Sequence, residues 1–161
     1  MTTQNTQTGT ARFFVPTTRR QWMYVIAAGL AAGIVAWLGG ILLTLWVFTP
    51  LFCQATDSIA LCATTEFAGT HTATIFAIVV GSIILIRSDI VRPLLVSIAA
   101  GLVLWGLQLW GFPSDFAKAL VVVLLYPVVY AALFWLTRPN KAWLALVLAL
   151  AFVVITKIAT L

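Results

Sequence analysis

Charged side chains are scarce in this sequence. Only 8% of its 161 residues are charged, whereas 63% are hydrophobic. A soluble domain carries about 25% charged residues, because it needs polar groups to cover its surface. The scarcity excludes an ordinary soluble domain and indicates that lipid covers much of the protein.

The motifs of common metal and catalytic sites are also missing. The sequence contains no CxxC, HExxH, GxGxxG or phosphate-binding GxxxxGK[ST] pattern, and His71 is its only histidine. Such motifs place ligands or catalytic groups at fixed spacing. We therefore expect no enzymatic activity, no metal and no cofactor.

The net charge of +5 does not indicate a nucleic-acid partner. Nucleic-acid-binding proteins gather Lys and Arg on one face or along one helix. Here the basic residues stand at the ends of apolar runs, which is typical of membrane topology. The partners that we expect are the lipid bilayer and other membrane subunits or further copies of the chain.

Five long apolar runs are what the sequence does contain. About 20 apolar residues in a helix cross a bilayer. The runs cover approximately residues 22–48, 67–86, 93–110, 116–136 and 142–160. They predict an all-α integral membrane protein with five transmembrane helices in a single domain, residues 17–161. A cleaved signal peptide is the competing interpretation of the first run, but a signal has only 7 to 15 apolar residues.

The segments outside the runs complete the predicted organisation. Residues 1–16 begin with a Thr/Gln-rich stretch and form a disordered or interfacial tail. Residues 49–66 form the loop between the first two helices. The short links GFPSD and TRPNK predict that the last three helices are antiparallel neighbours. The first helix, joined through the longest loop, is expected to be the least constrained.

The basic residues predict the orientation. With the N-terminus in the cytoplasm, seven of the nine Lys and Arg residues lie inside, and only Lys118 and Lys157 lie outside. This is a clear positive-inside bias. It places the C-terminus and the 49–66 loop in the periplasm or exterior, and it predicts a multi-pass protein of the bacterial inner (plasma) membrane.

The first run carries a strip of small residues. Gly29 and Gly33 form a small-xxx-small pattern, with Ala28, Ala32 and Ala36 beside them. Small residues let helix backbones approach closely in a bilayer. The strip predicts a helix-packing face, either against the protein's own helices or against a partner or second copy.

Both cysteines lie in the 49–66 loop. An exported loop meets an oxidising compartment, which favours a disulfide between Cys53 and Cys62. Free or intermolecular thiols are one alternative. A zinc site that adds His71 and either Asp57 or Glu66 is the other.

A polar group that enters the membrane is usually functional. Glu66 and His71 stand at the start of the second helix, although five residues apart they do not share a face. Gln108, near the outer end of the third helix, could complete a site with them. Tyr126, beside Pro127 in YPVVY, and Asp57 are the remaining candidates, and Asp115 can pair with Lys118.

Three functions fit these features. The first is an accessory or assembly subunit of a membrane complex, which would use the small-residue face and the outer loop for contact. The second is a small oligomeric transporter or channel with its polar site at Glu66, His71, Gln108 and Tyr126. The third is a membrane-bound lipid-modifying enzyme with Asp57, Glu66 and His71 as its polar set.

Overall fold

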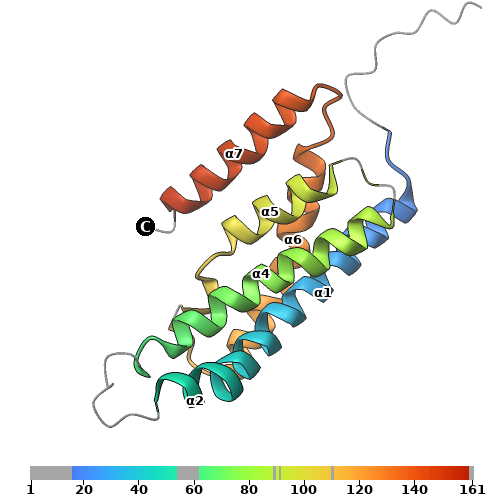
Figure 1. Ribbon diagram of the computed structural model, residues 1–161. Helices are drawn as coiled ribbons and strands as arrows, with labels where there is room; N and C mark the ends of the chain where they lie inside the picture. Colours follow the sequence, from blue (N-terminus) through green and yellow to red (C-terminus); the bar gives the residue numbers. More distant parts are fainter. Residues whose placement is uncertain (1–15, 54–61, 89, 91, 110, 160–161) are drawn as a thin grey trace, which may run out of the picture.

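The computed structural model describes residues 16–53, 62–88, 90, 92–109 and 111–159 (Figure 1). Every regular element in these ranges is a helix, which confirms the predicted all-helical class. Three helical stretches are long and apolar enough to cross a membrane: Arg19–Phe52, Thr65–Ile86 and Asp115–Leu136. Two further apolar stretches, Pro93–Leu109 and Ala142–Ile158, are shorter. The predicted tail, residues 1–16, lies outside the described residues except for Pro16.

The first helical stretch begins at a well-defined cap. The Thr18 hydroxyl accepts a hydrogen bond from the backbone N–H of Gln21, and the Gln21 side chain accepts one from the Thr18 N–H at 3.0 Å. This reciprocal pair satisfies two backbone donors that a helix start otherwise leaves unpaired. Helix α1 (Arg19–Leu43) therefore starts three residues before the apolar run itself.

The same stretch changes its winding before it ends. Helix α1 passes into the π-helical turn η1 (Thr44–Phe48) and then into α2 (Thr49–Phe52). Pro50 has no N–H, and its ring crowds the preceding turn, so a wider turn accommodates it. Thr49 donates its hydroxyl to the carbonyl of Thr44 at 2.7 Å. The expected loop 49–66 is thus partly helical, since α2 occupies its start and α4 begins at Thr65.

The third predicted helix, residues 93–110, is not continuous. Helix α5 (Pro93–Val103) ends, the chain turns, and a short 3₁₀ turn, η2 (Leu107–Leu109), follows. Gly106 adopts a positive φ of 84°, which glycine accepts without steric cost. Lys157 donates its ammonium to the carbonyl of Trp105 at 2.8 Å, so the interrupted backbone gains a charged partner. The expectation of one uninterrupted helix was wrong because nothing in the apolar composition marks this turn.

Helices α1, α4 (Thr65–Ile86) and α6 (Asp115–Leu136) form the centre of the bundle (Figure 1). Helix α1 packs along both α4 and α6, whereas α7 (Ala142–Ala159) packs mainly on α5. The expectation that the first helix is the least constrained was therefore wrong. Loop length limits which helices can be neighbours, but the shape of the helix surfaces decides how closely they pack.

Small residues give α1 this central position. A methyl group on Gly29 would overlap the backbone of Pro127, whose nitrogen would lie 2.8 Å away. One on Gly33 would lie 3.1 Å from the Cα of Val123. Ala28, Ala32 and Ala36 are fully buried, so the whole small-residue face lies against the protein's own helices.

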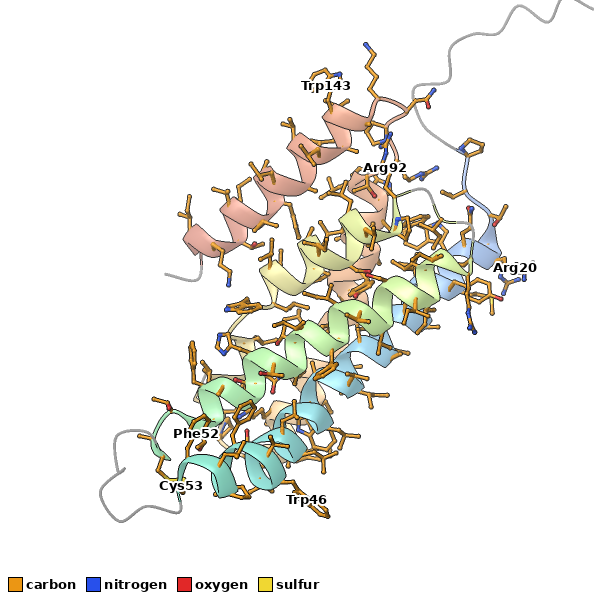
Figure 2. The ribbon with its side chains drawn as sticks, viewed as in Figure 1. Arg20, Trp46, Phe52, Cys53, Arg92 and Trp143 are labelled. Atoms are coloured by element: carbon orange, nitrogen blue, oxygen red, sulfur yellow. A yellow bond between two sulfur atoms is a disulfide. The ribbon has the colours of Figure 1, made fainter. Side chains whose placement is uncertain are left out.

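Arg92 ties two chain links together at the other end of the bundle from Cys53 (Figure 2). It adopts a left-handed φ of 63°, and its guanidinium donates to the carbonyls of Thr137, Pro139 and Asn140 at 3.2, 2.9 and 3.0 Å. The link between α4 and α5 is thereby joined to the turn between α6 and α7. Five donors in a planar fork suit arginine to this role.

The Gly29 contact predicts a selective effect of added methyl groups. Gly29→Ala should lower the free energy of unfolding by about 1–3 kcal/mol, because the new methyl meets the backbone of Pro127 rather than a movable side chain. Gly39→Ala is the matched control, since its methyl would lie 3.4 Å from that of Ala73, an ordinary contact. Thermal unfolding in mild detergent measures both variants. Equal stability of the two would contradict the close approach of α1 and α6.

A candidate ligand cavity at the disulfide end

An ion pair joins α4 to α6 at the end of the bundle nearest the disulfide. The carboxylate of Glu66 lies 3.0 Å from the ammonium of Lys118. Each residue stands in the first turn of its helix, and the α6 start is set by Ser114, whose hydroxyl accepts from the N–H of Ala117 at 3.2 Å. We considered Asp115 as the partner of Lys118, but Glu66 takes that place. The pair therefore connects the first turns of two sequence-distant helices across this end of the bundle.

Gln108 approaches the same region from η2. Its side chain is 5% exposed, and its Nε2 donates to the carbonyl of Ala36 at 2.8 Å. A methyl group on Gly40 would lie 2.6 Å from its Oε1, so glycine at 40 makes room for the amide. Within the described part of the chain, Oε1 has no hydrogen-bond partner. The Gln108 amide is thus held in place through Nε2, and its Oε1 can accept a hydrogen bond from a ligand.

These groups border a cavity of about 390 Å³ between α1, η1, α4, η2 and α6. The lining residues from α1 and η1 are mainly apolar, whereas those from α4, η2 and α6 are polar. The lining residues are Trp37, Gly40, Ile41, Thr44, Leu45, Thr65, Glu66, Thr70, Gln108, Asp115 and Lys118. This volume lies within the range of small-ligand pockets, about 300–1,000 Å³.

A second cavity of about 280 Å³ adjoins the first. It shares Glu66, Gln108, Asp115 and Lys118 with the first cavity. Its other lining residues come from the end of η2 and the link before α6: Leu109, Gly111, Phe112 and Ser114. The Glu66–Lys118 pair borders both spaces. The pair is therefore part of the lining of both cavities.

Thr44 lines the first cavity, but its hydroxyl does not open onto it. The Oγ1 atom is buried against Gly69 of α4 and, among the described residues, has no hydrogen-bond partner. A buried hydroxyl without a partner costs about 1–3 kcal/mol. The close packing of η1 on α4 therefore carries a local cost.

The structure separates the residues that the sequence suggested as one site. Glu66 and Gln108 line the cavity together. His71 does not, because its ring packs between Phe67, with ring centroids 3.8 Å apart, and Trp105, 4.7 Å apart. Its Nδ1 lies 2.7 Å from the carbonyl of Phe67. Asp57 lies outside the described residues.

Tyr126 is also remote from the cavity. It is 2% exposed, and its hydroxyl interacts with Thr74 on α4 inside the bundle. Tyr130, one turn further along, is also buried, and its hydroxyl lies close to Gly81 of α4. Both phenol rings therefore belong to the packing between helices.

Sequence reasoning missed Lys118, Trp37 and Thr44 as cavity residues. The signal for Lys118 was present, since it lies on the same predicted side as Glu66 and carries the opposite charge. Trp37 and Thr44 gave no such signal. Their position depends on the winding of α1 into η1, which apolar composition does not reveal.

The predicted disulfide is present beside this end of the bundle. Cys53 and Cys62 are bonded, with their Cα atoms 4.9 Å apart. Thr65, at the start of α4, donates its hydroxyl to the carbonyl of Cys62 at 2.9 Å. The bridge therefore joins the end of α2 to the start of α4. Its sulfurs are not thiolates, so they cannot form the zinc site considered as an alternative.

The sequence matches no protein-family model, and no curated protein or solved structure proved similar to it. The function has to be inferred from the site itself.

The disulfide predicts how the thiols react. A maleimide carrying a polyethylene glycol should leave the unfolded, non-reduced protein unshifted on a gel and add two labels after reduction. Cys53→Ser should expose one thiol without reduction, because Cys62 loses its partner. Labelling of the non-reduced wild-type chain would contradict the bridge.

Proposed function

We propose that the protein is a small membrane transport protein whose cavity receives its substrate from the outer side. In this proposal all five apolar helices cross the bilayer, with the N-terminus in the cytoplasm. Helix α7, of 18 residues, is about 27 Å long, close to the thickness of a hydrocarbon core. Helix α5 and η2 together form the third crossing, interrupted at Gly106.

The orientation assigns the cavity to the outer side. The positive-inside bias places Arg92 and its carbonyl partners in the cytoplasm, at the end away from the disulfide. Glu66, Asp115 and Lys118 then face the exterior. A bridge that forms in an oxidising compartment supports this assignment. The host membrane is, in this proposal, a bacterial plasma membrane.

The observation that carries the proposal is the cavity of about 390 Å³ with buried Gln108 at its wall. Two helix irregularities adjoin it, the π-helical η1 and the broken α5–η2 segment. Irregular backbone at membrane depth occurs where it lines a cavity, and broken helices form substrate sites in many transporters. Gln108 is buried and leaves its Oε1 acceptor facing the cavity, and a polar group inside a membrane bundle is usually functional.

The accessory-subunit hypothesis is supported by a different observation. Helix α7 packs mainly on α5 and exposes one apolar face, which includes Leu150, Ile155 and Ile158, each at least 65% exposed. Lipid can cover this face as well as another protein can. We therefore rank the accessory-subunit hypothesis below the transport hypothesis. Recovery of a partner protein after crosslinking at Leu150 in native membranes would favour the accessory-subunit hypothesis.

The outward orientation predicts which cysteines react from outside. Ile41 and its neighbour Leu42 are 40% and 53% exposed, but only Ile41 lines the cavity. Ile41→Cys should react in intact cells with a membrane-impermeant thiol reagent, because in this proposal the cavity beside it holds water. Leu42→Cys, facing lipid, should not. Reaction of both, or of neither, would contradict a water-filled outward cavity.

Blocking the cavity tests transport itself. The purified chain in liposomes should carry at least one solute from a panel of small ammonium, carboxylate, zwitterionic and neutral compounds. Ile41→Trp should reduce that flux to the level of empty liposomes, because the indole fills the space. Leu42→Trp should leave it within about twofold. No flux for any solute, or equal effects of the two variants, would refute the function.

A further inference from the structure

The charges around the cavity do not cancel. Two carboxylates, Glu66 and Asp115, line it together with one ammonium, Lys118. At neutral pH this set carries a formal charge of −1, and Lys118 is already paired with Glu66 at 3.0 Å. An anionic ligand would have to compete with Glu66 for the only cation among the described lining residues. A cationic ligand would neutralise the remaining charge.

The uncharged side chains that line the cavity also favour a positively charged ligand. Gln108 uses its Nε2 on the Ala36 carbonyl and presents Oε1, which can only accept a hydrogen bond. The half-buried ring of Trp37 lines the same space, and an indole face attracts ammonium groups. Each group is complementary to an N–H donor that bears positive charge.

The apolar lining residues indicate the chemical character of the uncharged part of the ligand. Ile41 and Leu45 line the same cavity. They provide no hydrogen-bonding side-chain atom, so the part of the ligand that meets them should be a hydrocarbon or aromatic group. An inorganic cation, which prefers an oxygen cage, does not suit a cavity lined partly by apolar side chains.

We infer that the cavity binds an organic cation, a primary or secondary ammonium attached to an apolar group, with Glu66, Asp115, Gln108 and Trp37 around the charge. This inference rests on the proposed function and names the substrate class of the same cavity. Lys118 tunes the affinity by offsetting one of the two carboxylates.

Charge-changing variants test the inference through the direction of their effects. Glu66→Gln and Lys118→Gln both remove the ion pair, so a purely structural role would give the two variants the same effect. For a cation, Glu66→Gln should weaken binding about tenfold, and Lys118→Gln should strengthen it by a similar factor. The double variant restores the net charge of −1 through Asp115 and should bind within about threefold of wild type.

The measurement is calorimetric titration of the full chain in phosphatidylcholine nanodiscs, whose lipid carries no net charge. The probes are phenethylammonium and its charge-reversed counterpart 3-phenylpropionate. The cation should bind saturably, Trp37→Leu should weaken it, and the anion should not bind. Thermal unfolding of each variant verifies that it is folded, and an exposed ion pair contributes little to stability.

Other results would overturn the inference. Saturable binding of 3-phenylpropionate alone would assign the cavity to anions and leave its role as a substrate site intact. Weakening by both single variants would assign the ion pair to structure. If neither probe binds but a neutral or anionic solute is transported, the inference of a cationic substrate is refuted and the transport function is not. Absence of both binding and flux would refute the proposed function as well.

Discussion

The close approach of α1 to α6 is the contact on which the rest of the structure depends. Gly29 and Gly33 leave room for the backbone at Pro127 and Val123, and no larger residue could stand there without moving a helix. In a bilayer the hydrophobic effect does little to hold helices together, so such close packing carries much of the association. Because α1 lies between α4 and α6, it fixes the distance between their first turns, where Glu66 meets Lys118.

The cavity exists because this packing does not continue to the end of the bundle. The closest approaches of α1 to α6 are at Gly29 and Gly33, and the cavity lies beyond them, where α1 passes into η1. Gln108 enters from η2, after the break that follows α5, and bonds to Ala36. Pro50 and Gly106, two residues that interrupt regular helix, thus shape the walls of one space.

Apolar run length predicted the all-helical class, and residue size predicted the small-residue face. The Cys53–Cys62 bridge followed from two cysteines in one loop that we expected to be exported. They could not predict the break at Gly106, because glycine is common within membrane helices and only its φ marks the turn. Glu66 and Gln108 were recognised as polar groups in an apolar setting. His71 was grouped with them for the same reason, but its ring packs on Phe67 and Trp105 instead. Composition identifies polar residues, whereas tertiary packing decides which of them share a cavity.

The central claim is that an organic ammonium enters the space between α1, α4 and α6. Photo-crosslinking tests this most directly, with an arylalkyl ammonium that carries a diazirine and with mapping of its adducts by mass spectrometry. Adducts should concentrate at Glu66 and between Ile41 and Leu45, and excess phenethylammonium should abolish them. Adducts confined to the lipid-facing side of α7, or adducts that excess ligand does not reduce, would contradict the claim.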